Sequence, residues 1–453
     1  MIPRYLSELA PVVGGRLHGE DVLVRSVVSD SRAARPGALF VALRGERMDG
    51  HDFVADALAR GAVAALVDRP LDGVPCLEVA DTGAALLELA RDERRRRPAT
   101  RVIGITGANG KTSTKDLAAA VLGTRFRTHA SPASFNTEVG LPVTLLGAAP
   151  DDEVIVAEMG ARRIGDVALL CEVARPEVVV VTNVGVAHLE VFGSWEAIVE
   201  ASAEPVEALG EDGLAILNAD DAVVRTYAGR TRARVVWFGR SPEAEVRAED
   251  VALDAEGRAR FALVTPEGRE PIELRVPGEH MVENALAAAA VGRALGVPPA
   301  EIAVALKGAR VSAWRMETFT TADGVRVVND AYNANPESMA AGLKAARWMA
   351  REGRLVAVLG HMAELGPISL AEHERLGELV VRIGVDRLIT VGEPARAILR
   401  AAVREGLEPE HGVAVDTPAE ALEELRRLLR PGDVVLVKGS RVVGLEVVAE
   451  GLR

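Results

Sequence analysis

Short runs of apolar, mostly β-branched residues recur along this chain of 453 residues and alternate with stretches of helical periodicity. Such runs are typical of buried strands, and helical stretches between them typically cross from one parallel strand to the next. The clearest predicted strands are 38–43, 62–67, 354–360, 386–391 and 433–438. The pattern therefore predicts an α/β fold, with a doubly wound, Rossmann-like domain at the C-terminal end.

Local signals mark several helix ends. A helix at 52–60 should end at Gly61, and capping boxes are predicted at Ser369 with Glu372 and at Thr417 with Glu420. Pro418, at the first helical position after Thr417, suits a helix start because its missing N–H would have no partner there.

The middle of the chain opens with a predicted strand at 101–106 and a helix at 112–121. Further strands are predicted at 153–157, at 177–182 and in the run LAILN, and 232–275 is predicted to be antiparallel, with a hairpin around 266–268. The length and these patterns predict three domains. They are a smaller N-terminal α/β domain at 1–98, a central parallel-sheet domain at 99–311 and the C-terminal domain at 312–453.

Composition narrows the function classes. The net charge of −13 argues against nucleic acid or an anionic membrane surface as the partner. No apolar run is long enough to span a membrane and the start lacks a leader pattern, so we expect a soluble, cytoplasmic protein. The basic run 94–97 is interpreted as a solvated helix end. Cys76 and Cys171 fit no metal spacing and are expected to be buried and reduced.

The strongest chemical signal is TGANGKT, between the strand at 101–106 and the following helix. Glycines at 107 and 110 let backbone N–H groups approach phosphate oxygens at a helix N-terminus. Lys111 would reach the β- and γ-phosphates, and Thr112 would bind Mg²⁺. The strict phosphate-loop pattern has glycine where this chain has Ile105, and a plain glycine-rich turn is the alternative. The predicted ATP-binding residues of this loop are Gly107, Ala108, Asn109, Gly110, Lys111, Thr112 and Ser113.

Two later strands end in side chains that can hold a metal ion. The strand 153–157 is followed by Glu158, and 177–182 by Asn183 and His188. Because parallel strands bring their carboxyl ends to one edge of a sheet, Glu158 and His188 are expected near the phosphate loop. The sequence predicts Thr112, Glu158 and His188 as ligands of Mg²⁺, and Lys111, Glu158 and His188 as the catalytic residues.

These motifs together resemble the Mur ligase family, the ATP-dependent amide-forming enzymes of peptidoglycan precursor synthesis. TGANGKT, TNVGVAHLE, LNADD and the helix carrying Asn284 are similar to the family's central domain. Lys115, DAYNANPESM, GHMAELG and KGSR are similar to the member that joins D-alanyl-D-alanine to UDP-N-acetylmuramoyl-tripeptide. The resemblance implies ATP and Mg²⁺ as cofactors, an acyl-phosphate intermediate, these two small-molecule substrates and a monomer.

The resemblance also implies roles for residues outside the loop. Asn284 would meet the adenine, and Arg315 and Asp330 would reach the nucleotide from the third domain. The implied substrate-binding residues are Ser31 and Arg32 for the UDP portion, Asn136 and Thr137 in the central domain, and Asn333, Asn335 and Ser338 near the incoming dipeptide.

Two positions depart from the family's pattern. Ser202 stands where the family usually has a lysine that is carbamylated to bind a metal, so a second cation would need other ligands, with Glu200 or Glu204 as candidates. Met281 follows His280, at a position where the family often has an asparagine.

Other function classes remain open at this point. The loop alone also suits a small-molecule kinase, or another ligase of the family acting on a different peptide or a folate-like acid. A nucleotide-dependent switch protein is a further alternative, although the N-K-x-D motif of a GTPase is missing.

Overall fold

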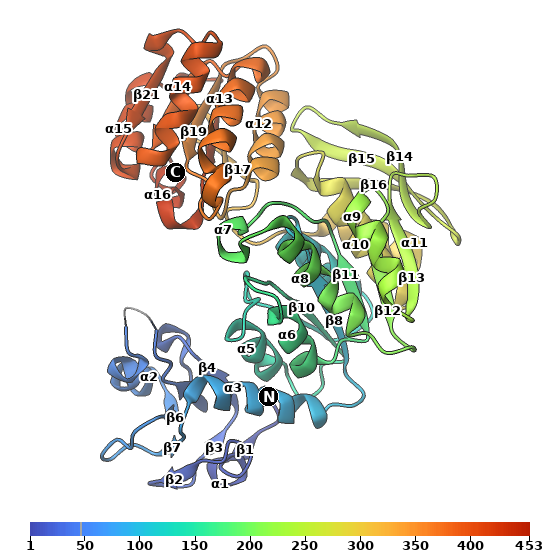
Figure 1. Ribbon diagram of the computed structural model, residues 1–453, viewed down its shortest axis with the longest axis vertical. Helices are drawn as coiled ribbons and strands as arrows, with labels where there is room; N and C mark the ends of the chain where they lie inside the picture. Colours follow the sequence, from blue (N-terminus) through green and yellow to red (C-terminus); the bar gives the residue numbers. More distant parts are fainter. Residues whose placement is uncertain (46–47) are drawn as a thin grey trace.

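The computed structural model describes residues 1–45 and 48–453. The chain forms a three-domain α/β fold, as predicted, in which the C-terminal part packs on one end of the central part and the N-terminal part on the other (Figure 1).

The N-terminal part is built on a five-stranded sheet with the order β2-β7-β6-β5-β4, parallel except for the edge strand β2. Its strands are β2 (Arg16–His18), β4 (Ser26–Val28), β5 (Ala38–Val41), β6 (Ala62–Val67) and β7 (Cys76–Glu78), beside the short pair β1 (Arg4–Tyr5) and β3 (Leu23–Val24). Its helices are α1 (Leu6–Leu9), α2 (Val54–Ala59) and α3 (Thr82–Arg95). The predicted strands at 38–43 and 62–67 and the helix at 52–60 are confirmed within a few residues.

A nine-stranded sheet forms the central part, in the order β16-β15-β14-β13-β12-β11-β8-β10-β9. Its strands are β8 (Arg101–Thr106), β9 (Thr128–Ala130), β10 (Val154–Glu158), β11 (Val178–Val181), β12 (Leu214–Asn218), β13 (Arg234–Gly239), β14 (Val246–Leu253), β15 (Arg258–Thr265) and β16 (Gly268–Pro277). The antiparallel prediction for 232–275 is wrong for β13, which pairs in parallel with β12 and β14, and right for β14 to β16. The predicted hairpin is confirmed by the pairing of Thr265 with Gly268.

Helices cover both faces of this sheet (Figure 1). They are α4 (Lys111–Leu122), α5 (Gly140–Gly147), α6 (Asp166–Ala174), α7 (Leu189–Phe192), α8 (Trp195–Glu207), α9 (Ala222–Thr226), α10 (Met281–Ala294) and α11 (Pro299–Gly308). The alanine-rich α10 is buried along most of its length. A Cβ at its Gly292 would lie 2.4 Å from a methyl group of Val121 on α4, so small residues are what let these two helices touch.

The C-terminal part carries a six-stranded sheet of order β17-β18-β22-β19-β20-β21, parallel except for the edge strand β17. Its strands are β17 (Glu317–Thr320), β18 (Arg326–Asp330), β19 (Leu355–Gly360), β20 (Arg387–Val391), β21 (Gly412–Val415) and β22 (Val434–Lys438). Its helices are α12 (Pro336–Ala350), α13 (Ser369–Ile383), α14 (Arg396–Glu405), α15 (Pro418–Leu428) and α16 (Glu446–Glu450). The doubly wound prediction is confirmed.

One of the two predicted capping boxes is present. Thr417 and Glu420 cap α15 reciprocally, with Pro418 at the first helical position. The box at Ser369 is wrong, because Ser369 already lies inside α13 and the helix has no side-chain cap. The ring of His373 contacts the carbonyl of Ser369 instead, at 2.6 Å.

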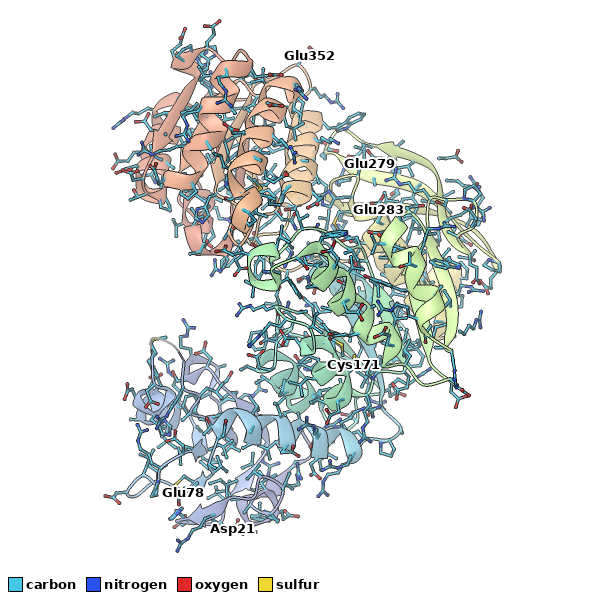
Figure 2. The ribbon with its side chains drawn as sticks, in the orientation of Figure 1. Asp21, Glu78, Cys171, Glu279, Glu283 and Glu352 are labelled. Atoms are coloured by element: carbon cyan, nitrogen blue, oxygen red, sulfur yellow. The ribbon has the colours of Figure 1, made fainter. Side chains whose placement is uncertain are left out.

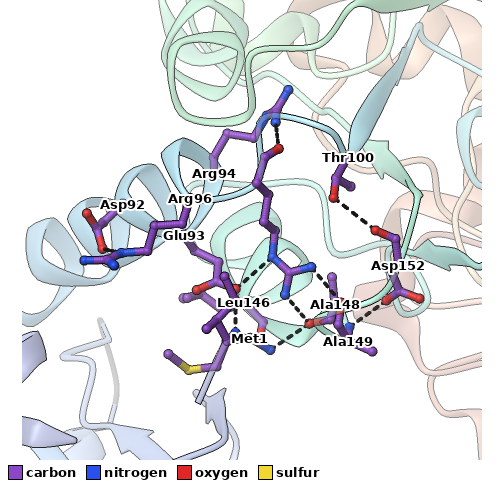
Figure 3. A network of polar contacts seen from close by, with 12 residues as sticks. Met1, Asp92, Glu93, Arg94, Arg96, Thr100, Leu146, Ala148, Ala149 and Asp152 are labelled. Carbon is purple, nitrogen blue, oxygen red and sulfur yellow. Dashed lines mark hydrogen bonds and ion pairs between the residues drawn. The ribbon is translucent and has the colours of Figure 1, made fainter. Parts of the chain in front are cut away.

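The prediction of a solvated helix end for the basic run 94–97 is right for Arg95 and Arg96, which are exposed, and wrong for Arg94 and Arg97. Arg94 and Arg97 are only 7% and 5% exposed. The Arg97 guanidinium donates to Ala148 O and Ala149 O at 2.9 and 2.6 Å, and its Nε donates to the fully buried Glu93 carboxylate at 2.8 Å (Figure 3 shows this network). These bonds tie the end of α3 to the end of α5 and satisfy Arg97. Arg94 is satisfied separately, because its Nε donates to Ala174 O at the end of α6, at 2.8 Å.

Around this tie the two parts share one apolar core. Leu86 and Leu89 of α3 pack in the same cluster as Leu141 and Leu145 of α5. The N-terminal and central parts therefore share one packed apolar interior.

Two sequence-based expectations about cysteines and membranes can be checked directly. Cys76 and Cys171 are both free and buried, as predicted, and Cys171 lies on α6 in the central part (Figure 2). Within the described residues, every helix is too short or too polar to cross a bilayer.

We predict that Arg97→Met lowers the free energy of unfolding by about 3 kcal/mol, because it leaves the buried Glu93 carboxylate without its main cation. Urea denaturation followed by circular dichroism measures this change. Arg95→Met is the matched control: Arg95 is half exposed and pairs with Asp92 at 3.3 Å, so its loss should cost no more than about 1 kcal/mol. Equal effects of the two substitutions would contradict the interpretation.

Candidate functional site

The loop between β8 and α4 has the conformation that a phosphate-binding turn needs. Gly107 and Gly110 have positive φ values of 134° and 82°, and Gly110 is the N-cap of α4. A Cβ on Gly110 would lie 2.1 Å from Asn284 Oδ1, and one on Gly107 would lie 2.1 Å from Thr182 Oγ1. Only glycine fits both positions, so the loop backbone can approach a ligand closely.

The end of β11 fixes this loop in place. Asn183 O accepts from Ala108 N at 3.0 Å, and Asn183 Oδ1 accepts from Asn109 N at 2.8 Å. Thr182 Oγ1 donates to Asn109 O at 2.7 Å. The protein's own hydrogen bonds therefore hold the loop backbone in place, which lowers the entropy cost of binding an anion.

Lys111 is the first residue of α4 and folds back over the loop. Its ammonium donates to Gly107 O at 2.5 Å and Ala108 O at 3.3 Å. Burial lowers the pKa of Lys111, while the charge of Glu158 acts in the opposite direction. Since its hydrogen-bond partners are neutral carbonyls, an anion at the loop would compete well for this cation.

Four oxygen-bearing side chains meet beside the loop. Thr112 Oγ1 donates to Glu158 Oε2 at 2.8 Å, and Asn136 Nδ2 donates to Glu158 Oε1 at 2.8 Å. Ser134 Oγ lies 2.9 Å from Thr112 Oγ1. Thr112 and Glu158 are almost fully buried. A hydroxyl and a carboxylate this close fit Mg²⁺, which prefers oxygen ligands and completes its shell with waters and phosphates.

His188 lies in the same region but contacts the C-terminal part. It takes a left-handed conformation (φ 62°), and its Nδ1 contacts the Glu364 carboxylate, which follows β19. Burial lowers the pKa of His188 more than Glu364 raises it, and the charges of Lys111 and Arg162 lower it further. The described residues contain no cluster of three or more His, Cys, Asp or Glu side chains arranged around a metal position.

Lys115 lies one turn further along α4, and its contacts hold neighbouring segments of the protein together. Its buried ammonium donates to Ser131 O at 2.7 Å and Ala133 O at 3.0 Å, and lies 2.8 Å from Asp116. These contacts hold the segment that leads to Ser134 against the phosphate loop.

In the C-terminal part, three sequence motifs are joined to one another by hydrogen bonds and an ion pair. We refer to them as the C-terminal wall of the site. Lys438 pairs with Asp330 and donates to Asn333 O at 3.1 Å. Ser440 Oγ accepts from Ala363 N at 2.9 Å and lies 3.3 Å from Ala334 O. The motifs DAYNANPESM, GHMAELG and KGSR are thus adjacent at the carboxyl ends of β18, β19 and β22.

Two polar side chains join this wall to the phosphate loop. Asn335 Nδ2 donates to Asn109 Oδ1 at 2.8 Å, while the Asn335 oxygen caps α12. The Arg315 guanidinium donates to Ser134 Oγ at 3.1 Å and stacks on the Tyr332 ring, 4.2 Å from its centroid. The C-terminal wall is therefore docked on the nucleotide side of the central part.

These walls enclose a cavity of about 890 Å³. It brings together most of the predicted site residues: the seven residues of the loop, Asn136, Thr137, Glu158, His188, Asn284, Arg315, Asp330, Asn333, Asn335 and Ser338. Their roles with a ligand stay predictions, but their convergence from two domains supports a common site.

Ser31 and Arg32 are not part of this cavity. Ser31 is buried in the N-terminal part, and Arg32 is exposed with its guanidinium on Asp30 at 2.7 Å. Their prediction as UDP ligands remains a prediction about a separate subsite.

Asn284 is not an exposed helix residue. It is buried on α10, with its Oδ1 accepting from Thr114 Oγ1 at 3.3 Å beneath Gly110, and its Nδ2 faces the sulfur of Met281 at 3.4 Å. It therefore lies directly against the phosphate loop.

Ser202 lines the cavity, but the two candidate replacements for the missing lysine do not. Glu200 pairs with Arg230 at 2.6 Å, and Glu204 caps α6 by accepting from the backbone of Gly165 and Ala168. The suggestion that Glu200 or Glu204 helps to hold a second cation is therefore wrong for this arrangement.

Sequence reasoning assigned no individual role to two residues that help to hold the site together, Ser134 and Glu364. It did single out Asn183 at the end of a buried strand, but not the hydrogen bonds by which Asn183 holds the phosphate loop. The partners of Ser134 and Glu364 include groups on the other domain, and no local pattern encodes such a contact.

The geometry defines a nucleotide-dependent enzyme in which a phosphate loop faces a second domain. Comparison with known families identifies it further. Residues 105–292 match the Mur ligase middle domain, 314–441 the Mur ligase glutamate ligase domain, and 23–93 the Mur ligase family catalytic domain. The chain belongs to the Mur ligase family and is a ligase.

Its relatives cover its whole length. A UDP-N-acetylmuramoyl-tripeptide--D-alanyl-D-alanine ligase from Mycobacterium leprae is 44% identical over 100% of this chain and 98% of its own. Two solved structures share the fold over nearly their full lengths. One is the UDP-N-acetylmuramoylalanyl-D-glutamyl-2,6-diaminopimelate--D-alanyl-D-alanyl ligase of Acinetobacter baumannii (TM-score 0.85, 30% identity, 99% and 98% covered). The other is a MurF ligase from Thermotoga maritima in complex with ADP (TM-score 0.79, 30% identity, 94% and 96% covered).

We predict that Gly110→Ala weakens ADP binding at least tenfold, because the added methyl group meets Asn284 and the backbone must leave its left-handed conformation. Isothermal titration calorimetry measures this directly. Gly229→Ala is the control, since no atom lies within 4 Å of a Cβ at that position. If Gly110→Ala bound ADP with an affinity within about twofold of that of the unsubstituted protein, the conformation of the loop would not control ADP binding.

Proposed function

We propose that this protein joins D-alanyl-D-alanine to UDP-N-acetylmuramoyl-tripeptide by an ATP-dependent amide-forming reaction, in the synthesis of peptidoglycan precursors. The observation that carries the proposal is the cavity, in which a phosphate loop faces DAYNANPESM, GHMAELG and KGSR across two domains. The full-length relative from Mycobacterium leprae, whose name states this reaction, supports it.

The chemistry follows from the groups that line the cavity. The terminal carboxylate of the tripeptide attacks the γ-phosphorus, ADP leaves, and the amine of the dipeptide then displaces phosphate from the acyl phosphate. Attack of one anion on another requires positive charge and N–H donors, which Lys111 and the loop backbone supply. Mg²⁺ would be held by Thr112 and Glu158, and its charge would offset that of the phosphates. We propose His188 as a further metal ligand and catalytic residue.

The remaining assignments divide the substrates among three domains. We propose that 1–98 binds the UDP portion through Ser31 and Arg32, that 99–311 binds ATP, and that 312–453 presents the dipeptide through Asn333, Asn335 and Ser338. In this scheme Asn136 and Thr137 contact the tripeptide, and Asn284, Arg315 and Asp330 the nucleotide. Holding three reactants in line can contribute roughly 7–11 kcal/mol to lowering the barrier.

The cellular setting follows from the same proposal. We propose that the enzyme works in the cytoplasm as a monomer, and that its product supports cell-wall growth, cell shape and cell division.

We predict that ADP release requires ATP, Mg²⁺, UDP-N-acetylmuramoyl-tripeptide and D-alanyl-D-alanine together, and that omission of any one abolishes it. Lys111→Ala should reduce turnover to background, because no other cation among the residues that the structure describes donates to the loop carbonyls of Gly107 and Ala108. Lys344→Ala is the control, since Lys344 is exposed on α12 and outside the cavity. A stable phosphate ester, formed without a peptide acceptor, would support a kinase instead and contradict the proposal.

Position 202 gives a second test of the mechanism. Serine has no amine that carbon dioxide could carbamylate, so we expect turnover to be independent of added bicarbonate. The same ADP-release assay, run in carbonate-depleted buffer and with millimolar bicarbonate, measures this. Ser202→Lys supplies the missing amine, and we expect only that variant to respond. Clear stimulation of the unsubstituted protein would overturn the prediction.

A further inference from the structure

Nearly every cation that lines the cavity is already held by a partner. Among the described residues, Lys111, Arg315, Lys438 and Arg441 each make a hydrogen bond or an ion pair. Arg162 is different. It lines the cavity on the turn between β10 and α6, it is exposed, and its guanidinium has no such partner anywhere in 1–45 and 48–453.

The carboxylates of the cavity show the same contrast. Most of them accept from a neighbour: Glu158, Asp166, Asp221, Glu283, Asp330 and Glu364. In the part of the chain that the structure describes, only Glu138 and Glu337 among the lining carboxylates lack a partner. Glu337 is on α12, next to Gly185. Glu138 is on the central part, just before α5.

Glu138 and Arg162 lie on two segments that are pinned together. Gly160 N donates to Asn136 O at 2.8 Å, and a Cβ on Gly160 would lie 3.0 Å from the Asn136 amide carbon. Glu138 follows Asn136 by two residues, and Arg162 follows Gly160 by two. The cavity wall beside Glu158 therefore carries one unpaired carboxylate and one unpaired guanidinium on adjacent turns.

A pair of opposite charges that do not pair with each other is suited to a zwitterionic ligand. We propose that Glu138 and Arg162 bind the side-chain head of the third residue of the acceptor peptide, and that they favour a diamino dicarboxylic residue such as 2,6-diaminopimelate over lysine. This inference rests on the proposed function, since it needs a peptide whose terminal carboxylate lies near Lys111 and Glu158.

The two residues would recognise different groups of the ligand, Glu138 the amine and Arg162 the carboxylate. Diaminopimelate and lysine both carry an amine on the last side-chain carbon, and diaminopimelate adds a carboxylate on the same carbon. Glu138 can accept hydrogen bonds from either amine. Arg162 has a partner only in the diaminopimelate peptide, where its planar fork can bind the carboxylate in a bidentate manner.

The test compares two UDP-N-acetylmuramoyl-tripeptides, ending in diaminopimelate or in lysine, with ATP, Mg²⁺ and D-alanyl-D-alanine. The unsubstituted protein should show a kcat/KM at least about tenfold higher for the diaminopimelate peptide, as expected for one charge-assisted bidentate contact. Arg162→Gln should lower kcat/KM for that peptide at least about tenfold and change the lysine peptide less than about twofold. Glu138→Gln should lower kcat/KM for both peptides.

Arg163→Gln is the matched control, because Arg163 is the exposed neighbour of Arg162 and lies outside the cavity lining. It should leave both values unchanged. Equal kcat/KM values for the two peptides, or equal losses for both in Arg162→Gln, would overturn the inference while leaving the proposed reaction intact.

Calorimetric titration of each peptide in the absence of ATP separates this inference from the reaction itself. If no peptide supports turnover, the proposed function fails. A preference for the diaminopimelate peptide that Arg162→Gln removes would still support the subsite, and equal affinities of the two peptides would reject it.

Discussion

The parallel register of three central strands is the constraint on which the site depends. Glu158, the last residue of β10, lies opposite Ile105 of β8, and Val181 of β11 lies opposite Thr106. The phosphate loop, the Glu158 carboxylate and the Thr182–Asn183 peptide therefore reach the same edge of the sheet. Because side chains alternate along a strand, a slip of one residue would turn Glu158 away from Thr112 and place it against the apolar core. The apolar residues of β8, β10 and β11, buried on both faces, make that slip costly.

The buried charged side chains of this protein differ in the kind of partner that each one has. Buried ions occur where backbone carbonyls or opposite charges can satisfy them. Arg97 donates to carbonyls at the junction of the N-terminal and central parts, and Lys115 donates to a carbonyl behind the phosphate loop. Lys111 is held only by neutral carbonyls, which leaves its charge available to a phosphate. Arg97 and Lys115 each also have a carboxylate beside them, Glu93 and Asp116, and this permanent anion is what distinguishes their structural role from the chemical role expected of Lys111.

The sequence was sufficient to predict those elements and motifs that depend on residues close together in the chain. The phosphate loop, the strand ends at Glu158 and Asn183, and the capped start of α15 all depend on residues within a few positions of one another. Contacts between distant segments were out of reach. The Asn335–Asn109 hydrogen bond joins residues of two domains, and the burial of Arg94 and Arg97 depends on carbonyls at the ends of α5 and α6. A charged run at a helix end has the same local pattern whether it faces water or a second domain, so the solvated interpretation failed there.

The central part meets its two neighbours in physically different ways. The N-terminal and central parts share an apolar core, and their separation would expose that core to water. The C-terminal part contacts that loop through polar side chains such as Asn335 and Arg315, whose hydrogen bonds can be exchanged for bonds to a nucleotide or to water at little cost. A polar contact of this kind is easier to open than an apolar one, because separation exposes groups that water satisfies. The fold therefore combines an apolar junction between the N-terminal and central parts with a polar contact between the phosphate loop and the C-terminal part, and the polar contact is the one that separates at the lower cost.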